Sequence, residues 1–226
     1  MSVRQHILAP NTAFATPYYV INSRKAGPVF MIVSGIHGNE PASIAAAQAL
    51  AGKFQRSELT LSRGKLIIVP LVNQRAYRRK SRGVPDLNRT FPHADSSRAG
   101  HPLSDAVFAL AKRYRPAWYL DLHEANGLSQ HNPRRVGQTL MVSRGTRAAS
   151  AARRIISVMN HSVGVPSYRF NIKHRERAGT SRMAVQQLLG AKAVTVETCW
   201  SLDFKLRVKY QQRIVRHFLK AAGIMN

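Results

Sequence analysis

Two histidines and two glutamates stand out in a chain that is otherwise poor in acid. His37 and Glu40 lie three residues apart in a Gly-Ile-His-Gly-Asn-Glu segment, His123 ends an Asp-Leu-His segment, and Glu197 follows an apolar run. Because the chain has only 10 acidic residues against 35 lysines and arginines, a random scatter would rarely place acids at such positions. Two imidazoles and one carboxylate form a known donor set of catalytic zinc sites. The pattern indicates a metal site, with a second carboxylate left for proton chemistry.

The pair of His37 and Glu40 is a weak signal when it is taken alone, since a surface loop with one hydrogen-bonded histidine has the same spacing. Asp121 stands two residues before His123 and therefore faces the same side of a strand, where it would orient the ring. Glu124 follows His123 directly, so on an extended strand it would point away from the metal. A solvated or substrate-rim role is expected for Glu124.

Apolar, β-rich runs alternate with alanine-rich segments of helical spacing, which predicts an α/β sandwich around a mostly parallel or mixed sheet. The expected strands cover residues 18–21, 29–33, 66–72, 118–122, 139–142 and 193–196. The expected helices cover residues 41–54, 103–114, 147–163, 182–189 and 202–222. The polar stretches 73–100 and 124–137 are expected to be functional loops, and 171–180 a mobile segment.

These elements would bring the four residues to one edge of the sheet, because ligands of open α/β sheets bind at the carboxyl ends of the strands. His123 and Glu197 each follow an expected strand directly. His37 and Glu40 lie on a loop that leaves a strand and enters a helix at Pro41, a residue that suits a first helical turn.

The size and composition of the chain favour a single domain over residues 1–226, with 44% hydrophobic residues to bury in one core. No stretch approaches the roughly 18 apolar residues of a membrane-spanning helix, so no transmembrane segment is expected. The first twenty residues lack the apolar run of a secretory signal, which favours a cytoplasmic location; a trimmed signal would leave the cell envelope open. One cysteine, Cys199, excludes an internal disulfide and is expected to be a small buried residue.

The formal net charge of +25 attracts polyanions in general, so anionic cell-wall polymers, nucleic acid and acidic small substrates all remain eligible partners. Arginines and lysines are spread along the whole chain and form no single basic tail. This distribution weakens the case for a dedicated nucleic-acid arm. It is also the distribution expected if a basic host proteome simply substitutes arginine on solvated faces.

A more specific signal is the heptapeptide Asp-Leu-Asn-Arg-Thr-Phe-Pro at residues 86–92. With it, the chain resembles the zinc carboxypeptidase superfamily, and most closely its succinylglutamate desuccinylase/aspartoacylase branch. The resemblance covers about residues 30 to 200, with all motifs in the family's order. It implies a three-layer sandwich in which helices flank a mixed, mostly parallel sheet. It also implies one zinc ion held by His37, Glu40 and His123, with Glu197 as general base and then general acid.

Three further roles follow from the same resemblance. Arg89 matches the arginine that grips a substrate carboxylate, and Asn88 stands beside it in the substrate site. Arg82 is the best match for the arginine that polarises the scissile carbonyl, although its distance from the Asn-Arg pair is one residue shorter than in aspartoacylases. Asp86 is expected to anchor the loop by accepting hydrogen bonds from backbone or arginine groups.

About 29 residues follow Glu197, so the C-terminal β-rich domain of aspartoacylases is expected to be missing here. The leading hypothesis is therefore a zinc-dependent hydrolase of an amide or peptide bond in a substrate with a free carboxylate. Carboxypeptidase-like action on peptides or peptidoglycan stem peptides fits an open cleft. One alternative is an N-acyl amino acid deacylase of the desuccinylase or aspartoacylase type. Another is a non-catalytic module that binds anionic polymers.

Overall fold

An eight-stranded sheet in the order β1-β2-β4-β3-β5-β8-β6-β7 forms the centre of the molecule. The computed structural model describes residues 1–94, 96 and 98–226. The strands are β1 (Ser2–Leu8), β2 (Thr16–Asn22), β3 (Val29–Ser34), β4 (Lys65–Val69), β5 (Trp118–Ala125), β6 (Thr139–Val142), β7 (Asn171–His174) and β8 (Lys192–Cys199). The helices are α1 (Pro41–Gln55), α2 (Gln74–Arg78), α3 (Pro102–Tyr114), α4 (Arg147–His161), α5 (Ser181–Leu189) and α6 (Phe204–Ala221), with 3-10 turns at Leu87–Arg89 and Pro166–Tyr168.

The centre of the sheet is parallel. β3 pairs with β4 on one side and with β5 on the other, and β5 pairs with β8, all in parallel register. β1, β2 and the β6–β8 contact add antiparallel pairs, and the outer strand β7 returns to a parallel pairing with β6. The prediction of a mixed, mostly parallel sheet is confirmed. The carboxyl ends of β3, β5 and β8 consequently lie side by side.

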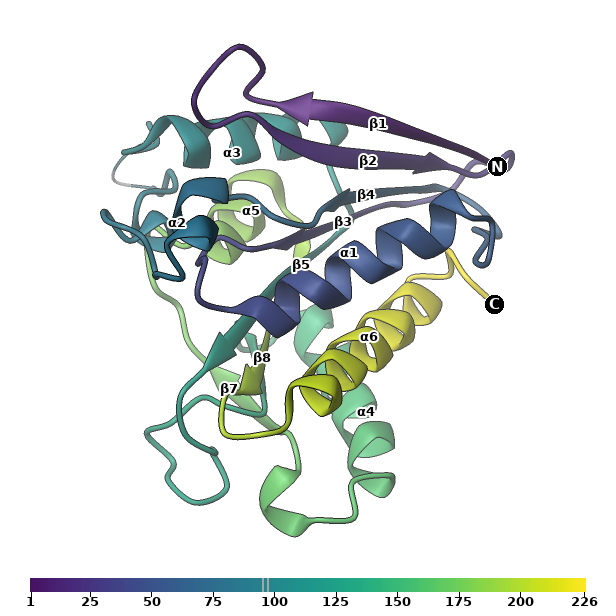
Figure 1. Cartoon of the computed structure of the whole chain (residues 1–226). Coiled ribbons are helices and arrows are strands. Elements are labelled where there is room, and N and C mark those ends of the chain that lie inside the picture. The colour runs from purple at the N-terminus through teal and green to yellow at the C-terminus, as the bar shows by residue number, and fades with distance from the viewer. Residues whose placement is uncertain (95, 97) are drawn as a thin grey trace.

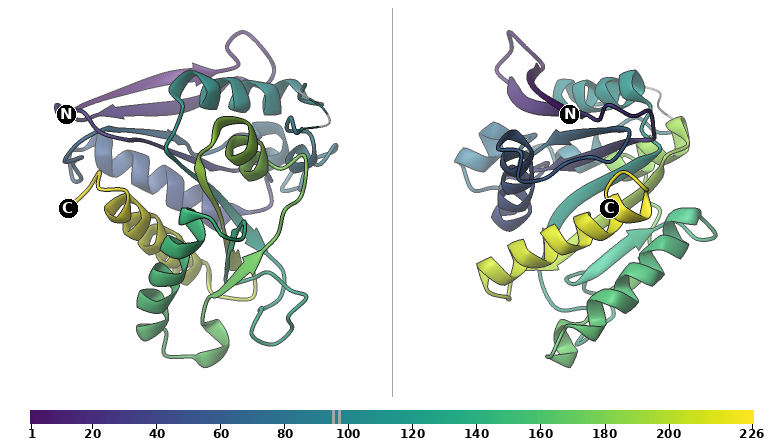
Figure 2. Two further views of the ribbon diagram at one scale, coloured as in Figure 1. Left: turned by 180° about the vertical axis from the view of Figure 1, so that it is seen from behind. Right: turned by 90° about the vertical axis from the view of Figure 1, so that its right-hand side faces the viewer.

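Helices cover both faces of the sheet, which gives the three layers that the resemblance implied. Figures 1 and 2 show α1, α6 and α4 over one face and α3 and α5 over the other. Each face has its own hydrophobic cluster, one with residues of α1, α4 and α6 and one with residues of α3 and α5. None of the described helices is long and apolar enough to cross a membrane.

Alternation along β5 explains how one strand serves both layers. Trp118, Leu120 and Leu122 pack in the α1–α6 cluster, whereas Tyr119 packs in the α3–α5 cluster. Since successive side chains of a strand point to opposite faces, Asp121 shares the face of Tyr119. The strand therefore presents Asp121 and His123 on one face, while Trp118, Leu120 and Leu122 pack in the apolar cluster on the other.

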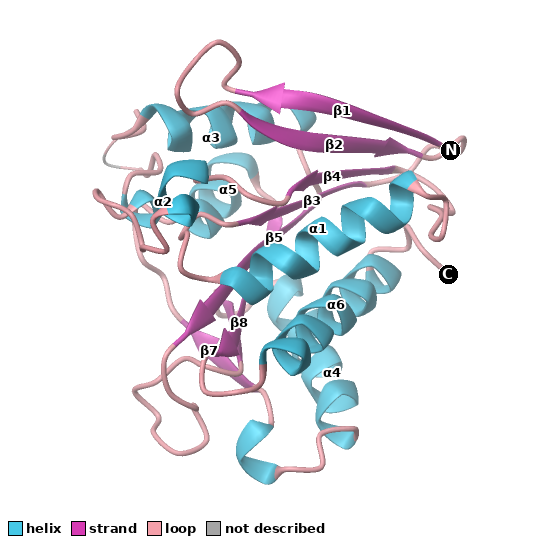
Figure 3. Cartoon of the chain, viewed as in Figure 1, coloured by secondary structure: helices cyan, strands magenta, loops and turns pink. Residues whose placement is uncertain are grey.

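The predicted helices and strands differ from the observed ones mainly where strands contain polar residues. β1 is exposed and polar, and β7 is a half-buried outer strand within the segment expected to be mobile (Figure 3); neither has the apolar run by which the other strands were found. The expected strand 66–72 ends at Val69, and the short helix α2 interrupts the expected loop 73–100. β5 and β8 extend beyond their apolar runs, so His123 and Glu197 lie within strands rather than after them.

Candidate active site

Three side chains converge at the carboxyl ends of β3 and β5. His37 lies on the loop between β3 and α1, Glu40 directly precedes α1, and His123 is on β5. The Nδ1 atom of His37 is 2.7 Å from Oε1 of Glu40, and the Nδ1 atom of His123 is 2.8 Å from Oε2 of the same carboxylate. One donor atom from each residue lies within 4.8 Å of the other two, and all three side chains are buried. The structure thus brings together the three predicted metal ligands.

Local chain geometry explains why the loop after β3 presents these groups. A Cβ atom on Gly38 would lie only 2.0 Å from the backbone of Ala76, so only glycine allows the loop to pack against α2. Pro41 then begins α1 immediately after Glu40. Glu40 occupies the N-cap position, but its side chain does not cap the helix. Its carboxylate is therefore free to face the two histidines.

Each histidine ring is held from its far side by a second carboxylate. Nε2 of His37 is 3.0 Å from Oδ1 of Asp86, and Nε2 of His123 is 2.9 Å from Oδ1 of Asp121. Such outer carboxylates fix the orientation of a ligating imidazole and raise its basicity. Asp121 lies where the sequence predicted it. Asp86 does anchor its loop, through the backbone N–H of Asn88, and it contacts a predicted metal ligand as well.

The electrostatics of the cluster suit a divalent cation. Burial alone would raise the pKa of Glu40, but the adjacent His123 and His37 outweigh it and lower that pKa below its usual value. The pKa of His123 is raised despite burial, because Asp121 and Glu40 stabilise its protonated form. An ionised carboxylate and two imidazoles that converge away from water fit a zinc ion, which would be held by these three groups in place of the imidazole protons.

Glu197 stands next to His123 in the parallel register of β5 and β8. Its side chain is buried, and no group of the described residues hydrogen-bonds to its Oε2 atom. Burial raises the pKa of Glu197 to about 8, with Glu40 and Asp121 adding to the rise and His123 opposing it. A carboxyl that exchanges a proton near neutral pH has the property needed by a general base that later acts as an acid.

A cavity of about 330 Å³ opens over these groups. Arg82 reaches its wall, where Nη1 lies 3.8 Å from Oε1 of Glu40 and Nη2 lies 3.0 Å from Oδ2 of Asp86. Arg89 also lines the cavity, with Nη2 3.7 Å from the same Asp86 oxygen. Asn88 is buried for most of its surface but also lines the cavity. Its Oδ1 accepts from the backbone N–H of Ser181, and its Nδ2 is 3.3 Å from Nε2 of His123.

Three arginines of the cavity were not identified from the sequence: Arg175, Arg177 and Arg182. Arg182, on α5, is buried, and burial lowers the pKa of its guanidinium to about 10. Its hydrogen bonds go to uncharged acceptors, namely the Ser143 hydroxyl, the Gln186 side-chain oxygen and a backbone carbonyl. In a chain with 25 arginines, no spacing pattern distinguishes a buried arginine from solvated ones.

Glu124 is buried rather than solvated, so that half of the expectation is wrong; it is among the residues that line the cavity, so the alternative of a substrate-rim position is not contradicted. It does point away from the histidines, as strand alternation requires, but this direction leads into the layer formed by α1 and α6. Its carboxylate is buried, accepts from the backbone N–H of Ala42 at 2.7 Å and lies 2.5 Å from Nη1 of Arg207. Apolar runs in the sequence cannot reveal these contacts, because Ala42 and Arg207 each lie more than 80 residues from Glu124.

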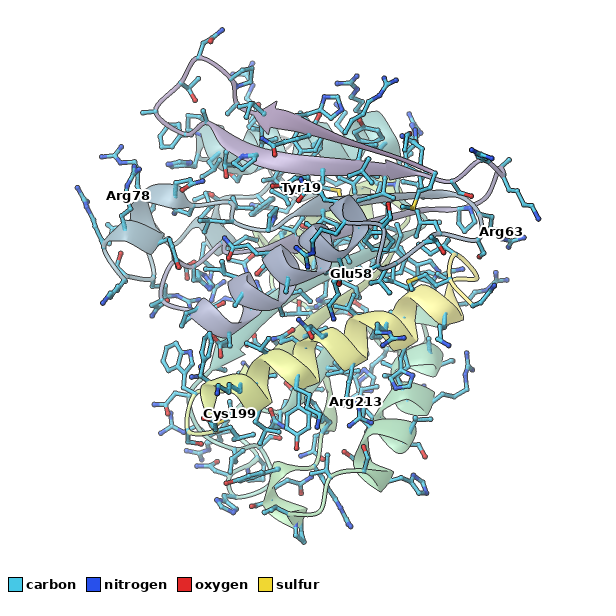
Figure 4. All side chains as sticks on the ribbon, turned by 45° about the vertical axis from the view of Figure 1, so that its right-hand side comes forward. Tyr19, Glu58, Arg63, Arg78, Cys199 and Arg213 are labelled. Atoms are coloured by element: carbon cyan, nitrogen blue, oxygen red, sulfur yellow. The ribbon has the colours of Figure 1, made fainter. Side chains whose placement is uncertain are left out.

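Positive charge is distributed over the surface outside the cavity. Figure 4 shows Arg63, Arg78 and Arg213 projecting from well-separated parts of the molecule. Cys199 is buried, as expected.

Residues 26–222 match the family model described as the succinylglutamate desuccinylase/aspartoacylase catalytic domain. No curated protein matches the sequence. Among solved structures, the product-bound cell shape determinant protein Csd4 from Helicobacter pylori is 19% identical, with a TM-score of 0.75 over 99% of this chain and 56% of that chain. Csd4 has also been solved with a tripeptide and with mDAP, and is described as a D,L-carboxypeptidase.

Two further structures share the fold. The product-bound ectoine utilization protein EutE from Ruegeria pomeroyi is 21% identical, with a TM-score of 0.67 over 94% of this chain and 62% of that chain. A succinylglutamate desuccinylase/aspartoacylase from Rhodobacter sphaeroides is 17% identical, with a TM-score of 0.69 over 99% of this chain and 66% of that chain. The chain spans little more than half of the length of the Csd4 structures that it matches.

Proposed function

The chain belongs to the succinylglutamate desuccinylase/aspartoacylase catalytic-domain family, and from this premise we propose that it is a zinc-dependent hydrolase of an amide or peptide bond. The observation that carries the proposal is that the buried side chains of His37, Glu40 and His123 converge next to the carboxyl group of Glu197. Zinc bound there supplies a Lewis acid that polarises a carbonyl and lowers the pKa of a coordinated water molecule.

The chain's own groups have distinct tasks in this proposal. Glu197 accepts a proton from the attacking water and returns it to the leaving amine, and its raised pKa suits both transfers. Arg82, at the cavity wall near Glu40, provides a fixed positive charge for the oxygen of the scissile carbonyl. Asp86 and Asp121 hold the two imidazoles so that both Nδ1 atoms face inward.

The substrate is proposed to carry a free carboxylate, because five of the described residues that line the cavity are arginines. Arg89 has the fork geometry that binds a carboxylate through two parallel hydrogen bonds. Arg182 adds a buried cation that hydrogen-bonds to uncharged groups among the described residues; the carboxylates of Asp121 and Glu176 attract it electrostatically, and a carboxylate of the substrate would add a hydrogen-bonded anion. The preferred substrate residue therefore has an acidic side chain or a second carboxylate.

A peptide end is the leading substrate, in carboxypeptidase-like cleavage that includes peptidoglycan stem peptides. Support comes from Csd4, which shares the fold and has been solved with a tripeptide and with mDAP. The second candidate is an N-acyl amino acid, which is favoured by the description of the matching family. Both substrates place a carboxylate next to the scissile bond.

Hydrolysis assays separate the two candidates. Zinc-loaded protein would be given N-acetylaspartate, N-succinylglutamate, short acidic peptides and peptidoglycan fragments under the same conditions. We expect release of a C-terminal residue from the peptides. Cleavage of the acyl amino acids alone would instead identify a deacylase, and no cleavage together with no zinc binding would contradict the proposed function.

A further inference from the structure

The back of the metal centre is held by three polar residues that have no part in the proposed chemistry: Glu124, Arg207 and Gln211. They lie on the face of the sheet covered by α1 and α6, opposite the histidine side chains. Glu124 has 3% of its surface exposed and Gln211 none. We propose that these three residues form a buttress that sets the relative position of the segments carrying the metal ligands, and thereby the affinity for the metal. This inference rests on the proposed zinc site.

Glu124 connects the two ligand-bearing segments through a single carboxylate. It is the residue after His123 on β5, and its Oε2 accepts from the backbone N–H of Ala42 at 2.7 Å, two residues after Glu40. The first N–H groups of a helix have no partner within the helix, and Glu40 does not supply one. Glu124, on β5, therefore caps the N-terminus of α1, and the carboxylate of Glu40 can contact the two histidines instead.

Arg207 and Gln211 attach α6 to the same place. Nη1 of Arg207 lies 2.5 Å from Oε1 of Glu124, so it offsets the charge of a carboxylate that would otherwise be buried alone. One helical turn later, Nε2 of Gln211 donates to the backbone oxygen of His123 at 2.8 Å and to Oγ1 of Thr198 at 3.1 Å. Thr198 follows Glu197, so Gln211 holds β5 and β8 together beside both functional residues.

The contacts of Glu124, Arg207 and Gln211 are expected to affect the relative position of the metal-ligand side chains more than the global stability of the fold. His123 and Glu40 come from segments 83 residues apart, and their donor atoms must stay within a few tenths of an ångström of metal-binding positions. Removing the supports lets the start of α1 shift relative to β5. Residues that orient ligands typically change metal affinity by roughly 10- to 100-fold when they are replaced.

The test measures the dissociation constant for zinc by competition with a chelating dye, in the full chain. Glu124→Ala removes the bridge, Gln211→Leu removes an uncharged support without leaving a buried charge, and Glu124→Gln retains an oxygen that can accept from Ala42. We expect weaker binding by about tenfold or more for the first two variants, with partial recovery in Glu124→Gln. The visible spectrum of the cobalt-loaded protein should change in the same order.

Thr146→Ala is the matched control, because Thr146 caps α4 through the N–H of Ala149, and its hydrogen bonds among the described residues stay between Ser143 and Ser150. It should lower the unfolding temperature of the metal-free protein without changing zinc affinity. Unchanged zinc affinity in folded Gln211→Leu and Glu124→Ala, or an equal loss in Thr146→Ala, would overturn the buttress while leaving the zinc site intact. Absence of zinc binding by the unaltered chain would overturn both proposals.

Discussion

Oδ1 of Asp86 lies 3.0 Å from Nε2 of His37, so the loop that carries Arg89 also orients a proposed metal ligand. The same carboxylate contacts Arg82 and Arg89 through its other oxygen. The arginines proposed to bind substrate and the proposed metal centre are therefore linked through one side chain. A change in the loop is expected to affect both metal affinity and substrate affinity.

Replacement of Asp86 tests this linkage. Asp86→Ala should weaken zinc binding by roughly 10- to 100-fold, because His37 loses the acceptor that fixes its ring. Asp86→Asn retains an oxygen for the ring N–H and should lose less. The measurement is zinc affinity by dye competition, followed by the Michaelis constant at saturating zinc. Identical zinc affinity in all three proteins would show that the contact does not orient His37.

Arg89→Lys tests recognition of the substrate carboxylate. Lysine keeps the charge but cannot form two parallel hydrogen bonds, so we expect a loss in kcat/KM of about 10- to 100-fold. Substrates whose carboxylate is amidated should be cleaved poorly by both proteins, with little difference between them. An equal loss on free and amidated substrates would assign Arg89 a structural task instead.

Arg182→Gln tests whether the cavity selects a second carboxylate. Because the buried guanidinium hydrogen-bonds to uncharged groups among the described residues, its removal should reduce kcat/KM for a glutamate-bearing substrate by roughly tenfold or more relative to a glutamine-bearing one. Arg147→Gln makes the same charge change at an exposed position on α4 and should leave the ratio unchanged. A constant ratio in Arg182→Gln would contradict the selectivity.

The pKa of Glu197 predicts how the stability of the metal-free protein depends on pH. Burial raises this pKa from 4.5 to about 8, so between these values the folded chain keeps a proton that the unfolded chain has lost. The contribution of Glu197 is thus most favourable below pH 4.5 and declines as pH rises towards 8, at no more than roughly 1.4 kcal/mol per pH unit.

Urea unfolding at pH 5 and pH 8 in the presence of a chelator measures this effect. Glu197→Gln cannot titrate, so its free energy of unfolding should fall less between the two pH values than that of the unaltered chain. Parallel declines in the two proteins would mean that Glu197 is ionised throughout this range.

The sequence allowed prediction of those helices and strands that have a periodic pattern of apolar residues. Runs such as 29–33 and 118–122 identified the central strands, and Pro41 marked the start of α1. β1 could not be found this way, because its side chains are mostly exposed and polar. The extension of β5 through His123 and Glu124 was missed since buried polar residues interrupt an apolar pattern.

The candidate site likewise has some features that could be predicted from the sequence and others that could not. Short motifs with fixed spacing, such as His37 and Glu40, can be recognised in the sequence because the chain itself holds the two residues together. Contacts between distant segments cannot, and the bridge from Glu124 to Ala42 joins residues 82 positions apart. Arg182 has neither a motif nor an unusual neighbour, so only its burial beside the cavity distinguishes it from other arginines.

The central claim is that Glu197 transfers protons beside a metal held by His37, Glu40 and His123. The most direct measurement is the rate of cleavage of an acidic peptide by the unaltered chain and by Glu197→Gln, each loaded with zinc and checked for metal content. The account predicts about one zinc ion in both proteins and a loss of hydrolysis by several orders of magnitude in Glu197→Gln. Full activity in Glu197→Gln with zinc bound would contradict it.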